Sequence, residues 1–298
     1  MEMVQLAAGG PWLSRIVWGL MRYLSWNLSP TAGAELIEKV MSLGITSFDH
    51  ADIYGGYRVE EAFGKALAEA DLSRDRYQIV SKADIRFKSD ATPDVKTHHY
   101  DTTTDYLLGQ ARRSVRLLGC EYLDVLLIHR PDPLMNADSV AEAFHILSSE
   151  GTVRHLGVSN FTSAQFALLQ SRLDVPLVTN QLQLSLLASD TLLDGTLDQA
   201  QQLRRAPMVW SPVAGGRLFG EASPSALTEE LWRIAAAHET SPDAIAYAWV
   251  LAHPSRAIPV AGTGKLDRLK AAVASLSTDL SRDEWFALWE AARGFDVP

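Results

Sequence analysis

Residues 45–67 read ITSFDHADIYGGYRVEEAFGKAL, which places an apolar run, a polar loop and a helical pattern in direct succession. The first five residues predict a buried strand, because short apolar runs are typical of parallel strands that are covered on both faces. Val59, Phe63 and Leu67 recur at helical spacing and predict a helix after the loop. The stretch is therefore a strand–loop–helix unit, and the fold depends on how often this unit repeats.

The unit repeats through the whole chain. Strands are predicted at residues 15–19, 45–49, 77–82, 124–129, 153–159, 176–181, 207–211 and 257–261. Helices are predicted at residues 36–43, 59–67, 107–118, 140–147, 162–171, 192–203, 226–237, 241–252, 265–273 and 282–293. No proline- or glycine-rich linker, charge run or low-complexity tract divides this alternation. It predicts one α/β domain spanning residues 1–298, a single (β/α)8 TIM barrel with extra helices.

A doubly wound open sheet is the alternative to the barrel. Such a sheet normally opens with a glycine-rich phosphate turn, and the N-terminal segment has no GxGxxG pattern. Residues 1–10, MEMVQLAAGG, precede the first predicted strand. We interpret them as a short β-hairpin that covers the bottom of the barrel.

The charge balance and the N-terminus limit the partners and the compartment. The 298-residue chain has a net charge of −9, which argues against nucleic acid or an anionic membrane as a partner. Its one cysteine, Cys120, has no second cysteine to pair with, as is usual in a reducing compartment. The N-terminus lacks a signal-peptide pattern, and no apolar stretch approaches the roughly 18 residues of a membrane span. We expect a cytoplasmic protein that acts on a small molecule, and the sequence does not indicate its oligomeric state.

Four reactive side chains follow three consecutive predicted strands, and a barrel would bring them to one rim. They are Asp49, Tyr54, Lys82 and His129. Each alone has an ordinary structural role, but together they form a proton-transfer set. A tyrosine hydroxyl has a pKa of about 10, which a nearby ammonium would lower, while an aspartate holds the ammonium and a histidine orients a carbonyl oxygen. The set supplies no electrons, so carbonyl reduction would also need a hydride donor.

The later strands end in residues suited to such a donor. Hydroxyl and amide groups of Ser159, Asn160 and Gln181 would hold a carboxamide such as that of nicotinamide, and the indole of Trp210 would stack on its ring. After the last strand, residues 261–270 read AGTGKLDRLK. Small residues there permit close backbone approach, and a following helix N-terminus favours an anion.

At this point the motifs resemble those of the aldo-keto reductase superfamily, in particular its bacterial NADPH-dependent oxidoreductases. FDHADIYG (48–55) is similar to the family's Asp-Thr-Ala-x-x-Tyr signature, and VSKAD (80–84) and YLDVLLIHRPDP (122–133) contain its lysine and histidine. GVSNF (157–161), TNQLQ (179–183), WSPVAGG (210–216) and IPVAGTGKLDR (258–268) follow in the family order. The resemblance covers nearly the whole chain.

The resemblance implies an NADPH-dependent carbonyl reductase in which Tyr54 is the general acid, assisted by Lys82, Asp49 and His129. It implies nicotinamide contacts from Ser159, Asn160, Gln181 and Trp210. First-loop cofactor contacts would come from Gly19 and Met21, and pyrophosphate contacts from Ser211, Val213 and Gly215. The adenosine end and its 2′-phosphate would be held by Gly262, Thr263, Gly264, Lys265 and Arg268. It implies no metal.

The chain departs from the family pattern at several of these positions. His50 replaces the usual threonine, Trp210 replaces the more frequent tyrosine, and Gly262 stands where many relatives have a lysine. Ala271 and Ala272 stand where many carry a Glu-Asn pair near the adenine, so a preference for NADPH over NADH rests on the cations of residues 265–268. Segment 84–104 is expected to wall the pocket, and with the tryptophans at 18 and 26 to shape substrate choice.

Two other functions compete with this one. A metal-dependent hydrolase on the same fold would use Asp49, His50, Asp52 and His129 as ligands. However, adjacent residues of a strand point to opposite faces, which separates Asp49 from His50. A family member that binds cofactor without catalysis is the second competitor, and the intact set of four reactive residues argues against it.

Overall fold

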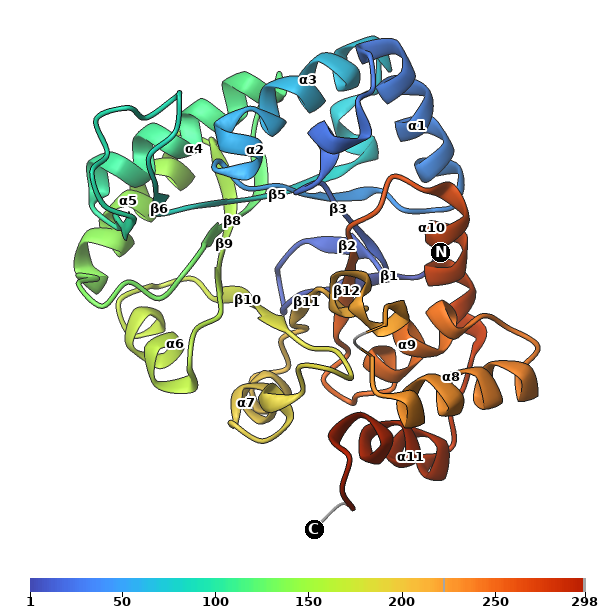
Figure 1. Cartoon of the computed structure of the whole chain (residues 1–298). Helices are drawn as coiled ribbons and strands as arrows, with labels where there is room; N and C mark the ends of the chain where they lie inside the picture. Colours follow the sequence, from blue (N-terminus) through green and yellow to red (C-terminus); the bar gives the residue numbers. More distant parts are fainter. Residues whose placement is uncertain (222, 297–298) are drawn as a thin grey trace.

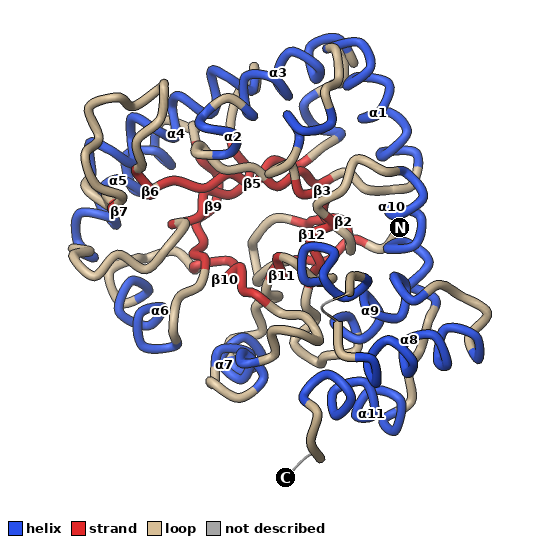
Figure 2. The backbone as a smooth tube through the Cα atoms, viewed as in Figure 1, coloured by secondary structure: helices blue, strands red, loops and turns tan. Residues whose placement is uncertain are grey.

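The computed structural model describes residues 1–221 and 223–296. Eight parallel strands close into a ring, in which the last strand pairs with the first (Figures 1 and 2). In order around the ring they are β3 (Val17–Gly19), β4 (Ser47–Asp49), β5 (Gln78–Ala83), β8 (Leu123–Ile128), β9 (Val153–Ser159), β10 (Leu177–Gln183), β11 (Met208–Trp210) and β12 (Ile258–Ala261). The closed ring confirms the predicted (β/α)8 barrel and excludes the open doubly wound sheet.

Helices surround the ring on its outer face (Figure 2). Those that follow successive strands are α1 (Pro30–Ser42), α3 (Val59–Glu69), α4 (Thr104–Leu118), α5 (Ala137–Ser149), α6 (Ser163–Gln170), α7 (Thr196–Gln202), α8 (Ser225–Ala237) and α10 (Leu266–Ala274). The extra helices are α2 (Tyr54–Tyr57), α9 (Pro242–Leu251) and α11 (Arg282–Arg293). Phe48 of β4 and Phe63 of α3 meet edge to face at 5.4 Å, which shows how strand and helix share one apolar layer.

A hairpin closes the N-terminal end of the barrel, as predicted. Its strands are β1 (Met3–Gln5) and β2 (Trp12–Ser14), so the second strand lies beyond the predicted segment 1–10. Val4 and Leu13 of the hairpin belong to one buried apolar cluster with Val80 and Val178 of the barrel interior. The hairpin therefore plugs the bottom, and the opposite end, where the strands have their carboxyl ends, is left for the cavity.

Several element boundaries differ from prediction; α1 and α4, for example, begin at Pro30 and Thr104 instead of residues 36 and 107. Three further differences have identifiable reasons. β4 begins at residue 47 instead of 45, because the Ser14 hydroxyl accepts hydrogen bonds from the backbone N–H groups of Thr46 and Ser47 in place of a strand ladder. β3 begins at residue 17 instead of 15, because the backbone N–H of Arg15 donates to the Glu2 carbonyl beside the hairpin. α7 begins at Thr196, four residues later than predicted, because Gly195 has a φ of 83° and the Asp194 carboxylate caps the Thr196 N–H.

The long segment 84–104 contains a short antiparallel ribbon, β6 (Ile85–Arg86) paired with β7 (His99–Tyr100), which was not among the predicted strands. Across residues 1–221 and 223–296, none of the helices combines the length and the apolar character that crossing a membrane would demand.

Candidate active site

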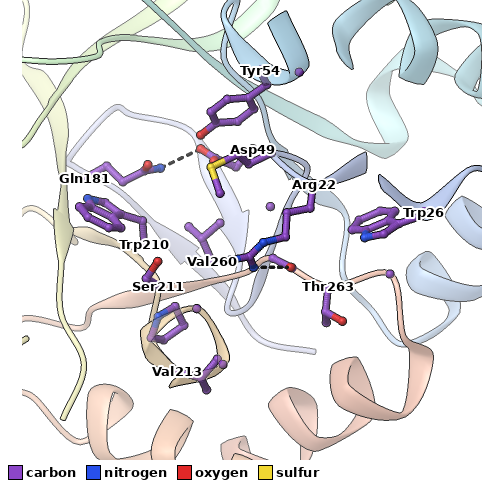
Figure 3. Close-up of a pocket in the computed structure, with 18 of the residues that line it drawn as sticks. Arg22, Trp26, Asp49, Tyr54, Gln181, Trp210, Ser211, Val213, Val260 and Thr263 are labelled. Carbon is purple, nitrogen blue, oxygen red and sulfur yellow. Dashed lines mark hydrogen bonds between the residues drawn. The ribbon is translucent and has the colours of Figure 1, made fainter. Parts of the chain in front are cut away.

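A cavity of about 910 Å³ lies at the carboxyl ends of the strands, which is within the range of small-molecule and cofactor sites. Every sequence-predicted site residue except Lys82 lines it. These lining residues are Gly19, Met21, Asp49, Tyr54, His129, Ser159, Asn160, Gln181, Trp210, Ser211, Val213, Gly215, Gly262, Thr263, Gly264, Lys265 and Arg268. Side chains from distant segments therefore meet around one space (Figure 3).

Lys82 lies directly behind the cavity wall and joins two of the lining residues. Its Nζ donates to both carboxylate oxygens of Asp49 at 2.8 and 2.7 Å and to the Tyr54 hydroxyl at 3.0 Å. The Lys82 Nζ also donates to the backbone carbonyl of His50 at 2.8 Å. Lys82 and Asp49 are both buried, so this ion pair is shielded from water and strongly coupled to the phenol.

The pKa of Tyr54 departs from the sequence-based expectation. Burial raises it above the ordinary value, and the nearby Lys82 ammonium offsets only part of that effect, so the predicted net lowering is wrong for this structure. For Lys82, burial alone would lower the pKa of the ammonium, but Asp49 and Tyr54 outweigh burial and raise it. The result is a protonated phenol beside a charged ammonium, which is the state that a proton donor requires.

His129 lies beside Tyr54, with the two rings nearly perpendicular and their centroids 6.1 Å apart. Burial, followed by repulsion from Lys82 and Arg130, lowers the pKa of His129 well below its ordinary value. The imidazole is therefore neutral near pH 7, and one of its nitrogens can still donate a hydrogen bond to an oxygen in the cavity.

The loop after β4 delivers Tyr54 through a tight backbone path. The backbone N–H groups of His50 and Asp52 donate to the carbonyls of Val80 and Lys82 on the neighbouring strand, which extends the sheet past the end of β4. Gly55 then turns the chain with a φ of 59°, and a Cβ at this position would lie 2.6 Å from a methyl of Leu24. Only glycine satisfies both the backbone angle and the close approach.

His50 and Asp52 occupy different surroundings from the reactive set. His50 is fully buried with its ring 4.7 Å from that of Phe63, on the helix side of the strand, whereas Asp49 points into the barrel. Burial raises the pKa of Asp52 well above its ordinary range, and repulsion from Glu60 and Asp84 raises it further. In the part of the chain that the structure describes, no group of three or more His, Cys, Asp or Glu side chains is arranged to hold a metal ion.

The amide and hydroxyl groups after β9 and β10 form a connected network. Asn160 accepts a hydrogen bond from the Trp210 indole at 2.9 Å and donates to Ser159 at 2.8 Å, which fixes the plane of the indole beside the cavity. The Gln181 amide donates to Asp49 at 2.7 Å, so it links this network to the buried ion pair (Figure 3). Because its Nε2 is engaged by Asp49, its carbonyl oxygen is the group of this side chain that could accept a hydrogen bond from a ligand.

The tryptophans at 18 and 26, which were expected to shape substrate choice, differ in position: Trp26 lines the cavity, whereas Trp18 is not among the lining residues. Trp18 is fully buried, stacks on Trp26 at 5.6 Å and donates its indole N–H to the Thr263 carbonyl at 2.9 Å. Trp26 packs on Gly264 so closely that a Cβ there would lie 2.6 Å from its ring. The pair therefore packs against the loop after β12.

The cavity is lined by more cations than the sequence indicated. Arg22 and Arg130 join Lys265 and Arg268, while the carboxylates that line it are Asp49, which is paired with Lys82, and Asp243. This excess of positive charge, together with small residues at 262 and 264, fits a ligand that carries several phosphates.

Sequence reasoning missed three of these groups. Arg130 and Arg22 follow His129 and Met21 directly, so counting every polar residue of the strand-end loops would have found them. Asp243, by contrast, lies on α9, whose apolar pattern gave no signal of a ligand-facing side chain.

Comparison with known proteins identifies the family and agrees with the barrel fold. A model described as "Aldo/keto reductase family" matches residues 15–293. The chain is 47% identical to "Oxidoreductase YdhF" of Escherichia coli over 298 residues, covering 100% of this chain and 99% of that protein. It is 40% identical to a "6-dehydroglucose reductase" of Agrobacterium fabrum over 286 residues, covering 96% of each. The glycerol dehydrogenase AKR11B4 from Gluconobacter oxydans shares the fold, with a TM-score of 0.84, 22% identity, and coverage of 99% of this chain and 97% of that one.

Proposed function

Because the chain belongs to the aldo/keto reductase family, we propose that it reduces aldehydes and ketones to alcohols with NADPH, using Tyr54 as the proton donor. The observation that carries this proposal is the buried chain of contacts from Asp49 through Lys82 to the Tyr54 hydroxyl, which opens onto a cavity rich in cations. The enzyme is an oxidoreductase, and the finer assignments of cofactor and residues are the proposal.

The proton follows a short path in this proposal. A substrate carbonyl oxygen lies between the Tyr54 hydroxyl and the neutral His129 imidazole, and both donate hydrogen bonds to it. As negative charge develops on that oxygen, the Tyr54 proton moves to it, and the Lys82 ammonium stabilises the phenolate left behind. Asp49 keeps the ammonium in place, and its own charge is balanced by the hydrogen bonds from Lys82 and Gln181.

The rest of the cavity holds the reduced dinucleotide, which supplies the hydride when bound. Ser159, Asn160 and Gln181 would bind the carboxamide, and the Trp210 indole would stack on the nicotinamide ring. Ser211, Val213 and Gly215 would contact the pyrophosphate, and Gly19 and Met21 would contact the cofactor from the first loop. Residues 262–265 and Arg268 bind the adenosine and its 2′-phosphate.

The substrate end of the cavity combines polar and apolar walls. Ile85 and Phe87 of segment 84–104 line it, together with Arg130 and the reactive set. The name of the Agrobacterium relative concerns a sugar that carries a carbonyl. We therefore include sugar aldehydes among the carbonyl compounds to be tested.

One experiment tests cofactor, chemistry and proton donor together. The loss of reduced-nicotinamide absorbance is followed with NADPH and with NADH over a panel of aldehydes, ketones and sugar aldehydes. Tyr54→Phe should bind NADPH with wild-type affinity and lose turnover by about 10²- to 10⁴-fold, because only the proton donor is removed. Near-wild-type turnover in that variant would refute the mechanism. NADPH binding without turnover of any carbonyl by the wild-type protein would favour a non-catalytic binding protein.

A further inference from the structure

Arg130 is a cation at the reactive end of the cavity to which the proposed reaction gives no role. It follows His129 directly in the loop after β8, and it lines the cavity. After burial and the charge of Lys82, the charge of Arg130 is a further influence on the pKa values of both Tyr54 and His129, so the guanidinium lies near these two groups. The cofactor contacts proposed above come from the loops after β3, β9, β10, β11 and β12, whereas Arg130 shares its loop with His129.

The backbone of Arg130 is held from the end of the neighbouring strand β5. Its N–H donates to the carboxyl group of the buried Asp84 at 2.9 Å. Asp84 has a φ of 131°, a backbone angle that favours glycine, so the chain accepts local strain where it presents this carboxyl group. Burial raises the pKa of Asp84 well above its ordinary range, which makes the carboxyl group a weak counter-ion. Asp84 therefore fixes the peptide of Arg130 without neutralising the guanidinium.

The guanidinium itself has no anionic partner. Among residues 1–221 and 223–296, no carboxylate forms an ion pair with it. Asp132, two residues further on, instead accepts hydrogen bonds from the Thr102 hydroxyl at 2.7 Å and the Leu134 N–H at 2.8 Å. The Arg130 Cζ lies 5.7 Å from the centroid of the Trp210 ring, and such a cation–π contact uses the charge but none of the N–H donors. These donors remain available to a ligand.

An unpaired guanidinium beside the reactive set differs from the other cation there, because Lys82 is already paired with Asp49. The planar fork of an arginine matches the two oxygens of a carboxylate. Ile85 and Phe87, which follow the neighbouring strand β5, line the same cavity with apolar side chains. Apolar walls limit the access of water, so a charge-assisted hydrogen bond formed between them is stronger than one at an open surface.

We propose that Arg130 binds a carboxylate of the substrate, so that the preferred substrates are aldehydes or ketones that also carry a carboxylate. This assignment rests on the proposed function, in which Tyr54 and His129 hold the carbonyl oxygen. Arg130 then holds the other end of the same molecule. It acts on the choice of substrate, whereas the proton transfer remains with Tyr54.

The test compares charged aldehydes with uncharged ones that have the same carbon skeleton. Succinic semialdehyde, 3-carboxybenzaldehyde and 4-carboxybenzaldehyde are each measured beside their methyl esters, at saturating NADPH and about pH 7. The wild type should show a kcat/KM about tenfold or more higher for at least one acid than for its ester, because only the acid forms the charge-assisted bonds. Arg130→Gln should remove this preference, mainly by raising the KM of the acid, and should bind NADP⁺ as the wild type does.

The matched control is Arg86→Gln, which removes the same charge from the neighbouring segment. Arg86 does not line the cavity and is paired with Asp101 at 3.2 Å, so its loss should leave the preference for the acid intact. Thermal unfolding of both variants shows whether they are folded. Because Arg130 is partly exposed and unpaired, Arg130→Gln should unfold near the wild-type temperature.

The outcomes separate this assignment from the function on which it rests. A preference for an acid that Arg130→Gln loses and Arg86→Gln keeps supports it. It is overturned if the wild type reduces the esters as well as the acids, if the preference survives in Arg130→Gln, or if Arg86→Gln loses it equally. Weaker NADP⁺ binding by Arg130→Gln also overturns it, because the guanidinium would then serve the cofactor. If the wild type reduces neither acids nor esters nor any other carbonyl compound, the proposed function itself fails.

Discussion

The buried residues around the cavity divide into charges that are compensated and groups that are kept neutral. Asp49 and Lys82 remain charged because each is bonded to the other, with further bonds from Gln181 and to the Tyr54 hydroxyl. A single buried charge would cost several kcal/mol, so neither residue is tolerable without its partner. His129, which has no carboxylate partner of this kind, is instead held neutral by burial.

The buried imidazole of His50 is expected to make the free energy of unfolding depend on pH. Burial, with a smaller contribution from Lys82, lowers the pKa of His50 from 6.5 to about 3. Between these values the unfolded chain binds a proton that the folded protein excludes, so stability falls as the pH falls. The contribution is complete above about pH 6.5 and is lost progressively toward pH 3.

The measurement is urea unfolding of the wild-type protein and of His50→Leu at about pH 7 and about pH 5. Wild type should lose about 2 kcal/mol more than the variant over this interval, since the unfolded-state histidine is protonated at the lower pH only in the wild type. The buried His129 is present in both proteins and cancels in the comparison. An equal loss in the two proteins would mean that His50 is accessible to protons in the folded state.

At the scale of elements, two glycines inside helices make a matched pair with opposite expected effects. A Cβ on Gly64 of α3 would overlap the Leu117 carbonyl oxygen and lie 2.9 Å from the Leu118 Cα, at the end of α4. Gly109 of α4 is exposed, and a Cβ there meets nothing within 4 Å.

Gly109→Ala should stabilise the protein by about 0.5–1 kcal/mol, because alanine is the better helix former. Gly64→Ala gains the same propensity but should destabilise by about 1–3 kcal/mol, because α3 must move away from the backbone of α4. Thermal or urea unfolding of both variants decides the matter. Stabilisation by both would show that the contact between these helices is loose.

The elements also show what the sequence could predict and where it stopped. Eight apolar runs and the helical stripes between them were sufficient for the barrel, because each strand–helix unit carries its own pattern. Boundaries failed where a side chain replaced the backbone ladder, as the Ser14 hydroxyl does before β4. The buried position of Trp18 was not predictable because both faces of a parallel strand are apolar, so no alternation indicates that Val17 faces the lumen while Trp18 faces the helices.

The site was predictable to the extent that strand ends are predictable. The reactive set and most of the lining residues follow strands directly, so locating the strands also located them. Asp243 comes from a helix that otherwise packs in the core, and its position depends on how α9 sits against the barrel. Such a residue has no local pattern, and only the assembled fold reveals it.

At the scale of the whole molecule, the overall charge and the local charge of the cavity have opposite signs. The net charge of −9 would repel an anionic dinucleotide, whereas the four cations that line the cavity attract it. The distance of each charge from the ligand determines which effect is stronger. At 0.1 M salt the Debye length is about 10 Å, whereas a chain of this size has a radius of gyration of about 19 Å. Charges on the remote surface are therefore screened, and those within hydrogen-bonding reach of the ligand are not.

This difference fixes the sign of the salt dependence of binding. If the lining cations dominate, NADPH affinity should fall roughly threefold or more between about 0.05 and 0.5 M salt, because each ion contact formed competes with dissolved ions. NADH should show the shallower dependence, as it lacks the 2′-phosphate that we propose Arg268 binds. If the net charge dominated, added salt would screen repulsion and tighten binding instead. Titrations of both dinucleotides at several salt concentrations give the sign, and affinity that rises with salt would mean that the cavity cations do not contact the phosphates.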